Sequence, residues 1–403
     1  MVLADFTPSF RKFDFVTDAS GYISMLIYNS HPPGSLFIAP KYYPDPNGTW
    51  SSHETQQKYS RFEYYWNLNL KQQSRGKAGR VYEVDKNPLH DYATDVVSKF
   101  NQHLVDDPCH GVPMYRLPRD AVVRYWDARM KYQSVVERRP ANLDKFASLL
   151  KKMGDAFEPS QVGITGSYLY EIYQDFSDIN FVVYDEAASI LHDMLMAESG
   201  LLKRQDIEIT MPSTTWPGWL GDKVDVLELL PAKTRRKGDK AVVPVKNRFI
   251  GSIHDPFDKR IRAGFWLGNT TDPHPHGTFK KTKLGIAVIT ARLSNGEDDL
   301  PSGHFHVDDV DLLGFHPTLD ITSKELASIT DANRNTNLTE KMHISAVQVI
   351  GEFNRMFLSN ESIIAFGLVE EITLAGQEKP VHELLVGGRE VGGWIFPRDD
   401  IIA

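Results

Sequence analysis

A glycine, a serine, an aspartate and an asparagine lie close together near the middle of the chain. Gly166 and Ser167 follow a short apolar segment, and Asp178 and Asn180 lie at the start of a second one. Glycine lets a ligand approach the backbone closely, and free N–H groups at the start of a helix favour a phosphate. Side chains two residues apart lie on one face of a strand. The spacing predicts a phosphate-binding turn beside two metal-binding side chains.

Residues 161–185 must supply the elements that position these side chains. Their sequence predicts a strand, the Gly-Ser turn, a helix and a second strand, in that order. The helix is expected over Tyr168 to Gln174, where three tyrosines recur, and packing explains these tyrosines better than base stacking does. Gly166 and Ser167 would then lie beside Asp178 and Asn180.

The pattern of Gly166-Ser167, nine residues, Ser177-Asp178-x-Asn180 and an apolar run resembles the nucleotidyltransferase superfamily typified by DNA polymerase beta and the kanamycin nucleotidyltransferases. It looks most like predicted archaeal and bacterial nucleotidyltransferases that carry extra segments on both sides of this core. The resemblance is close over about 25 residues and looser from Gln161 to roughly Arg236. It implies transfer of a nucleoside monophosphate from a nucleoside triphosphate to a hydroxyl, with release of pyrophosphate.

Nucleotidyl transfer needs a divalent metal, carboxylates that bind it and a group that helps to deprotonate the attacking hydroxyl. Mg²⁺ is the expected ion, with Mn²⁺ as the alternative. Asp178 is the first candidate ligand. Asp225 lies in a predicted apolar strand, about where the family carries its third carboxylate, and is expected to be a further ligand and the general base.

Asn180 departs from the family, which has a carboxylate at this position. Its amide oxygen could bind the metal, but the site loses one negative charge, which weakens binding of a second ion above all. A one-metal or weakened two-metal transferase and a protein that binds nucleotide without transferring it both fit this change. RNA-directed nucleotide transfer is a third interpretation. The acceptor is expected to be a small molecule or a protein.

Two further groups of residues have the right chemistry for ligands. Gly166 and Ser167 are expected to contact the β and γ phosphates of the nucleotide, and Arg235 and Arg236, in a basic run after the Asp225 strand, could bind the same phosphates. Charge runs are usually solvated loops, so the sequence does not establish this contact.

Two histidine pairs suggest a metal site of another kind. His274 and His276 flank a proline, and His304 and His306 flank a phenylalanine. Imidazoles suit zinc or manganese, but no third element with a recognisable ligand spacing accompanies either pair. The sequence therefore favours ordinary surface histidines in both places.

Composition narrows the class of protein. The chain has 403 residues, a net charge of −8 and a single cysteine, Cys109, which excludes an intrachain disulfide framework and a Cys-rich zinc site. No long apolar run is present, so we expect a soluble cytoplasmic protein without membrane contact. The acidic balance disfavours broad nucleic-acid binding without excluding a local basic groove.

The elements predict an α+β protein, with a nucleotidyltransferase-like mixed sheet, flanking helices and β-rich N-terminal and C-terminal parts. The expected domains are residues 1–140, 141–240 and 241–403. Strands are predicted within residues 13–43, 223–230, 283–292 and 363–397, and helices over residues 91–103, 119–137, 142–153, 185–199 and 341–358.

Overall fold

The computed structural model has a mixed α and β fold with several sheets and few helices, which confirms the α+β class at this level. The structure describes residues 10–62, 70–76, 79–84, 103–138, 141–175, 177–196, 205–212, 235–237, 240–248, 253–254, 262–272, 274–294, 303–317, 343–349, 360–386 and 393–398.

The chain divides into two compact units, each built from three segments. Unit 1 comprises Met1–Glu63, Tyr92–Leu202 and Gly251–Thr278, and unit 2 comprises Tyr64–Asp91, Lys203–Ile250 and Phe279–Ala403. Unit 1 combines parts of the predicted N-terminal domain and of the predicted core. The boundaries predicted after residues 140 and 240 stay a prediction.

The first sheet of unit 1 contains the N-terminal strands. It runs in the order β10-β1-β2-β3-β5-β4, and β9 pairs with both β3 and β8. These strands form where short β-branched and aromatic runs alternate with turn residues, as predicted for residues 13–43. They are β1 (Phe15–Asp18), β2 (Ile23–Leu26), β3 (Ser35–Pro44), β4 (Trp50–Ser51), β5 (Lys58–Arg61), β8 (Leu104–Asp107), β9 (Val112–Pro118) and β10 (Val122–Trp126).

The second sheet of unit 1 carries the predicted Gly-Ser turn and runs in the order β11-β12-β17-β16. Its strands are β11 (Val162–Thr165), β12 (Ile179–Tyr184), β16 (Ile253–His254) and β17 (Arg262–Gly268). β12 is antiparallel to β11 and parallel to β17. β12 is apolar on both faces and almost fully buried, so it forms the centre of this sheet.

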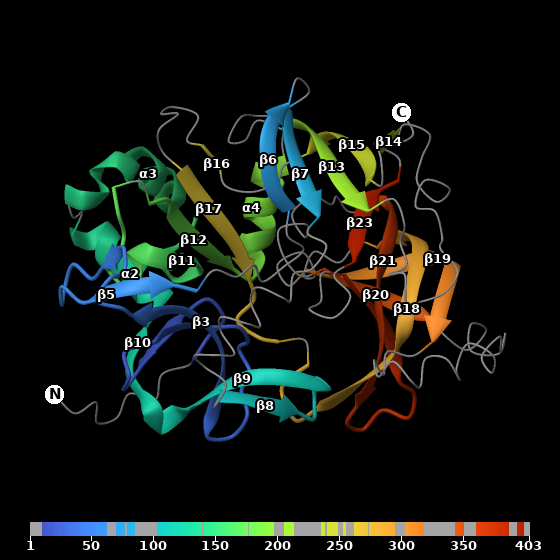
Figure 1. Cartoon of the computed structure of the whole chain (residues 1–403), viewed down its shortest axis with the longest axis horizontal. Helices are drawn as coiled ribbons and strands as arrows, with labels where there is room; N and C mark the ends of the chain where they lie inside the picture. Colours follow the sequence, from blue (N-terminus) through green and yellow to red (C-terminus); the bar gives the residue numbers. More distant parts are fainter. Residues whose placement is uncertain are drawn as a thin grey trace. The chain divides into compact units, whose positions relative to one another are not determined.

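Helices pack around this second sheet (Figure 1). The helices in the described part of unit 1 are η2 (Arg119–Ala121), α2 (Ala128–Arg138), η3 (Ala141–Phe146), α3 (Ala147–Ala156), η4 (Pro159–Gln161), η5 (Gly166–Tyr168) and α4 (Glu186–Met196). α2 contacts β11, and α4 contacts β12 and β17. α2 begins after Asp127, whose carboxylate accepts hydrogen bonds from the N–H groups of Arg129 and Met130 at 2.9 and 3.0 Å.

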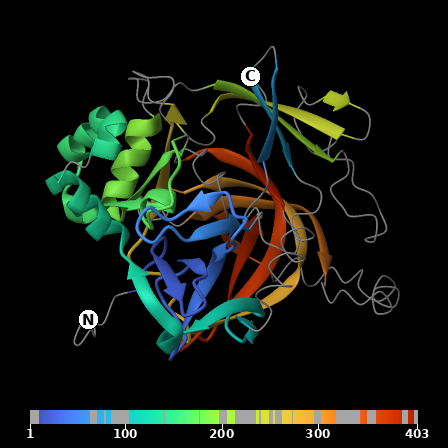
Figure 2. The same ribbon diagram turned by 60° about the vertical axis from the view of Figure 1, so that its left-hand side comes forward.

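Five strands of unit 2 close into a small barrel. They follow the order β18-β19-β20-β22-β21, and β21 pairs again with β18. Only the β20–β22 pair is parallel, and this is the strand order of the OB-fold, a five-stranded Greek-key barrel. Figure 2 shows these strands curving around one another. The five strands are β18 (Phe279–Leu293), β19 (His304–Pro317), β20 (Ile344–Val349), β21 (Ser362–Leu374) and β22 (Val381–Val386). A sixth strand, β23 (Trp394–Pro397), pairs with β21.

The other sheet of unit 2 has five strands in the order β14-β15-β13-β7-β6. They are β6 (Leu70–Gly76), β7 (Gly79–Val84), β13 (Gln205–Pro212), β14 (Arg235–Lys237) and β15 (Lys240–Arg248). β14 and β15 form an antiparallel hairpin, so Arg235 and Arg236 lie in a strand and not in a loop.

Two of the predicted helices are wrong over part of their length. Residues 122–126 form strand β10, because β-branched and aromatic residues there pair with β1, and the helix begins only after Asp127. Residues 344–349 form strand β20 in the barrel. The helices predicted over residues 142–153 and 185–199 are confirmed by η3 with α3 and by α4. Residues 91–102, in a predicted helix, and 223–230, a predicted strand, lie outside the described residues.

No helix in the described part of the chain is long and apolar enough to cross a membrane.

Candidate functional site

The turn after β11 brings the predicted motif together. Thr165, the last residue of β11, pairs with Asn180 in β12. The turn that starts at Gly166 therefore lies directly beside Asn180. Gly166 has a φ of +70°, a conformation that glycine adopts without strain. The chain therefore turns sharply over the start of β12, where Asp178 and Asn180 lie.

Two glycines make room for the Asn180 side chain. A Cβ at Gly166 would lie 2.9 Å from Nδ2 of Asn180, and a Cβ at Gly264 would lie 2.2 Å from its Oδ1. Gly264 is the partner of Asn180 in the parallel pair of β12 and β17. Real Cβ atoms do not approach this closely, so both positions must lack a side chain for Asn180 to keep its place.

Asp178 precedes β12 and is partly exposed. Its charge acts on two buried tyrosines of unit 1. Burial raises the pKa of Tyr168 first, and the negative charges of the neighbouring residues, Asp178 among them, raise it further. Burial also raises the pKa of Tyr42, to which Asp178 adds. Among the described residues no hydrogen bond or ion pair neutralises Asp178, which leaves its carboxylate available to a cation.

The strands on either side of β12 carry no further carboxylate. β11 has the sequence VGIT and β17 has the sequence RAGFWLG, and these two strands occupy both edges of β12. Asp225 lies outside the described residues. The described part of the site thus offers one carboxylate, from Asp178, and one amide, from Asn180.

The helix predicted after Gly166 is absent. The segment forms only the 3-10 helix η5 and further turns, and Glu171 takes a positive φ of 59°, which ends any regular helix. Ser167 is buried, and its carbonyl accepts a hydrogen bond from the N–H of Ile172 at 3.0 Å. The prediction that the tyrosines serve packing is confirmed for Tyr168, which is buried and stacks on Tyr173 with ring centroids 4.3 Å apart.

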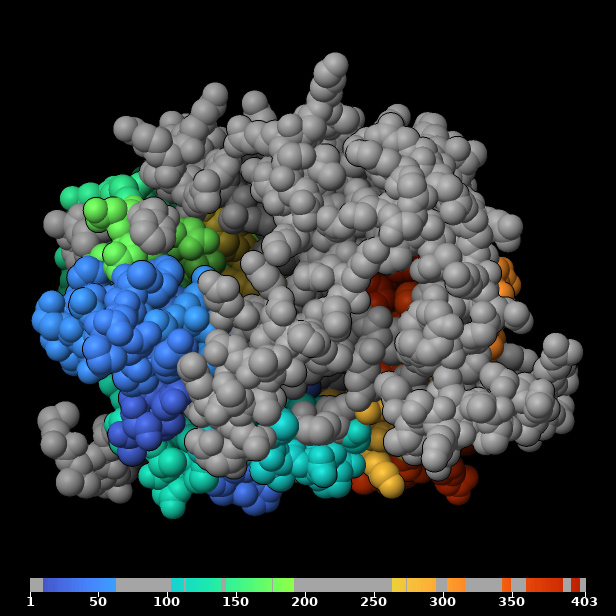
Figure 3. All heavy atoms as spheres, in the orientation of Figure 1, coloured from blue at the N-terminus to red at the C-terminus, as the bar shows by residue number. Residues whose placement is uncertain are grey.

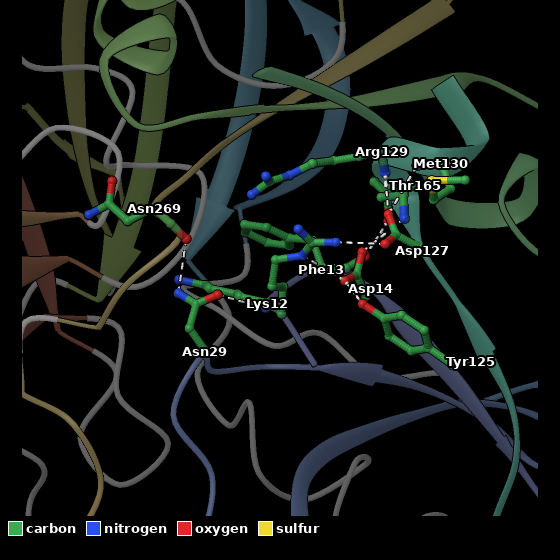
Figure 4. A network of polar contacts seen from close by, with 12 residues as sticks. Lys12, Phe13, Asp14, Asn29, Tyr125, Asp127, Arg129, Met130, Thr165 and Asn269 are labelled. Carbon is green, nitrogen blue, oxygen red and sulfur yellow. Dashed lines mark hydrogen bonds and ion pairs between the residues drawn. The ribbon is translucent and has the colours of Figure 1, made fainter. Parts of the chain in front are cut away.

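A buried network of hydrogen bonds connects the end of β11, just before the Gly166 turn, to the N-terminal segment (Figure 4). The Thr165 hydroxyl donates to the Phe13 carbonyl at 2.8 Å, which ties the end of β11 to the segment before β1. The next residue, Asp14, is fully buried, accepts the N–H of Ala128 at 2.9 Å and accepts the hydroxyl of Tyr125. Asp14 therefore joins β1, β10 and the start of α2, the elements that surround β11.

A second cluster of reactive side chains lies around Asp107, at the end of β8. The carboxylate is fully buried and contacts three basic side chains: His110 Nδ1 at 2.9 Å, His276 Nε2 at 3.1 Å and Arg116 Nη2. The rings of His110 and His276 both pack on Phe37, with centroids 5.3 Å away. Burial alone would raise the pKa of Asp107, but hydrogen bonds from His110 and His276 outweigh it and keep this pKa well below its usual range.

The only cysteine belongs to the same cluster. Cys109 is a buried free thiol two residues after Asp107, and its N–H donates to the Asp107 carboxylate at 3.0 Å. This cluster is not predictable from the sequence alone. The signals were the adjacent Cys109 and His110 and the pair of His274 and His276, but these motifs are more than 160 residues apart, and only the fold joins His276 to Asp107 at 3.1 Å.

The other histidine pair has a different environment. His304 is buried in the barrel of unit 2, where its Nε2 lies 2.7 Å from Glu383 Oε1, whereas His306 is exposed. Within the described residues these two histidines belong to no group of three metal-ligand side chains.

Neither protein-family models nor curated sequences nor solved structures give a match to this chain.

Proposed function

We propose that the chain is a metal-dependent nucleotidyltransferase that moves a nucleoside monophosphate from a nucleoside triphosphate to a hydroxyl of a small molecule or protein. The observation that carries this proposal is the pairing of Thr165 with Asn180, which sets the Gly166 turn directly against the start of β12. A phosphate-binding turn and a metal-binding strand must be adjacent if one ion is to bridge the protein and a triphosphate.

Asp178 and Asn180 are the described residues that would bind Mg²⁺, and Mn²⁺ is the alternative. Magnesium binds through one or two carboxylates together with substrate phosphates and water, so a partly exposed Asp178 with an amide beside it fits this donor set. Bound metal would neutralise the triphosphate and the leaving pyrophosphate. The role of Asp225 as further ligand and base, and the phosphate contacts of Ser167, Arg235 and Arg236, remain proposals from sequence.

One observation favours a second candidate function. β11 and β17 carry no carboxylate. Asn180 lies where the family that the sequence resembles carries a carboxylate. Such a site has less charge for two ions, as expected of a protein that binds nucleotide and transfers it weakly or not at all.

Pyrophosphate release separates the two functions. The purified chain is incubated with each of the four nucleoside triphosphates, with Mg²⁺ or Mn²⁺, and thermal shift reports binding in parallel. Metal-dependent binding with pyrophosphate release supports the transferase. Binding without release supports the second function, and no binding of any triphosphate rejects both.

Replacing Gly264 by alanine is expected to weaken metal-dependent triphosphate binding by about tenfold, about 1.4 kcal/mol. The added Cβ would lie 2.2 Å from Asn180 Oδ1, so the Asn180 side chain must move away. Titration calorimetry measures the change.

The matched control is Gly154→Ala in α3, where the Cβ meets only the Tyr132 hydroxyl at an ordinary 3.7 Å. Alanine there favours the helix by up to about 1 kcal/mol and should leave binding unchanged. Equal binding by both variants would contradict a role for the position of Asn180.

Asn180→Asp is expected to tighten Mg²⁺ binding by about tenfold, because the carboxylate has nearly the shape of the amide and adds the missing charge. The variant should also melt at a lower temperature without metal, since two carboxylates then share one strand end. Calorimetry with Mg²⁺ and thermal melting with and without the ion test both effects. Unchanged Mg²⁺ affinity would place Asn180 outside the metal's reach.

A further inference from the structure

Asp107, Cys109 and His276 bring a carboxylate, a thiol and an imidazole to one place in unit 1. Their possible ligand atoms all lie within 4.8 Å of one another, and the first two residues are buried. We propose that these three side chains form a binding site for a transition-metal ion of the zinc class. The site is independent of the proposed nucleotide site and uses none of its residues.

The backbone holds the three ligands in place without an ion. The turn after β8 is closed by a hydrogen bond from the Gly111 N–H to the Asp107 carbonyl at 2.9 Å. Oδ1 of Asp107 accepts the N–H groups of Cys109 and His110 at 3.0 and 2.9 Å, which fixes the carboxylate and the thiol relative to each other. The loop with His276 is anchored by the His276 N–H, which donates to the Ser30 hydroxyl at 2.8 Å.

The separation of the ligand atoms suits a small divalent ion. Two ligands at 2.0–2.1 Å from a tetrahedral zinc ion are about 3.3 Å apart. His276 Nε2 and Asp107 Oδ2 are 3.1 Å apart and share a hydrogen bond. An ion could therefore take the place of this hydrogen bond with little movement of either side chain, with the neutral imidazole as one ligand and the proton of the Cys109 thiol released to water.

The donor atoms select the class of ion. Thiolate and imidazole suit zinc and its neighbours, whereas Mg²⁺ prefers oxygen ligands. Three protein ligands with a fourth position left for water is the ligand count of catalytic rather than closed structural zinc sites. The nearby His31 is not a ligand candidate through Nδ1, because that atom accepts the N–H of Phe37 at 3.1 Å.

Two neighbouring side chains, His110 and Arg116, affect how tightly the site would bind an ion. His110 Nδ1 lies 2.9 Å from Asp107 Oδ1, and Arg116 contacts Oδ2, so the carboxylate is already neutralised without an ion. An incoming ion is repelled by the Arg116 charge, which lowers the affinity of the site. Oδ2 has a second lone pair, which allows it to keep Arg116 while it binds the ion.

The site lies near the surface of unit 1. Figure 3 shows the β8–β9 region, in cyan, at the molecular surface. Val105, two residues before Asp107, is 43% exposed, and the side chain of His276 is 11% exposed. The His276 imidazole is therefore the ligand most accessible to solvent.

Cobalt titration of the untagged protein tests the proposal, because Co²⁺ replaces Zn²⁺ and a thiolate ligand gives it a charge-transfer absorption in the near ultraviolet. We expect binding of about one Co²⁺ per chain with this absorption, displacement by Zn²⁺ and none by Mg²⁺. Cys109→Ser should lose the absorption, and His276→Gln should weaken binding at least tenfold, since even outer-shell changes cost about 10- to 100-fold.

His274→Gln is the matched control, because this histidine lies in the same loop and outside the group of three. Its affinity should equal that of the unchanged protein. No thiolate absorption in the unchanged protein, or equal loss of affinity in the His274 and His276 variants, would overturn the site.

A second measurement uses only the unchanged protein, in case the variants fail to fold. Cys109 is the only cysteine, so the rate of thiol alkylation reports this residue alone. Zn²⁺ should slow alkylation at least tenfold at saturation, and Mg²⁺ at the same concentration should leave the rate unchanged. Equal rates with and without Zn²⁺ would contradict a thiolate ligand.

Discussion

Replacing Asp178 by alanine is expected to lower metal-dependent nucleotide turnover by about 1,000-fold or more, about 4 kcal/mol, and to leave the fold nearly intact. Asp178 is the only carboxylate that the described residues of the proposed site supply, so its removal leaves the neutral amide of Asn180 as the only proposed ligand among them. The side chain is partly exposed, and no described residue pairs with it, so its loss removes little from the packing of β12. Pyrophosphate release and thermal melting measure the two effects.

Asp175→Ala is the matched control, because Asp175 is an exposed carboxylate three residues earlier in the same segment. Its turnover and melting temperature should equal those of the unchanged chain. If the unchanged chain binds triphosphate without turnover, the same pair of variants is compared by metal-dependent binding. Normal turnover or binding in the Asp178 variant would show that the carboxylate does not serve the metal.

The centre of the proposed nucleotide site is the part that sequence predicts best. β11, the Gly166 turn and β12 are local in sequence: an apolar run, a glycine and a second apolar run fix them within about 25 residues. Strand alternation then places Asp178 and Asn180 without knowledge of the rest of the fold. The requirement for glycine at position 264 was not predictable. It arises because β12 pairs in parallel with β17, more than 80 residues later, which places position 264 against the Asn180 side chain.

The errors in the sequence reading share a physical cause. A helix was predicted over residues 119–137, from apolar residues at helical spacing, and over residues 341–358. Instead, Val122–Trp126 pairs with β1, and Ile344–Val349 pairs with β19 and β22 in the barrel. Short apolar runs fit either period, and the decision falls to strand partners that are distant in sequence. Tertiary pairing determined the outcome in both segments.

The cluster around Asp107 shows the same limit for function. Cys109 and His110 are adjacent, and His274 and His276 are a visible pair, but neither motif has a ligand spacing of its own. The cluster forms only in the folded chain, where the His276 N–H donates to the Ser30 hydroxyl and His276 Nε2 lies 3.1 Å from Asp107 Oδ2. Mixed metal sites assembled from distant segments carry no local signature, so a single sequence cannot distinguish their histidines from surface histidines.

Asp14→Asn is expected to change the pH dependence of stability by about 3 kcal/mol between pH 4 and pH 7. Burial raises the pKa of Asp14 to about 6 from a usual value of 3.8, against hydrogen bonds from Tyr125 and from the Ala128 N–H, which lower it. Between these two values the folded chain binds more protons than the unfolded chain. The contribution of Asp14 is therefore full below about pH 4 and is lost as pH increases to about 6.

Asparagine does not titrate, so its variant should lack this loss while keeping an oxygen that accepts the Ala128 N–H. Urea unfolding of both proteins at several pH values gives the difference in unfolding free energy, and other titrating groups cancel in that difference. Asp155→Asn, an exposed carboxylate in α3, should show the pH dependence of the unchanged chain. A difference between the Asp14 variant and the unchanged chain that stays constant from pH 4 to pH 7 would mean that Asp14 is ionised throughout, with Arg11 as its counter-charge. The network behind the Gly166 turn would then be an ion pair and not a proton-bearing hydrogen-bond network.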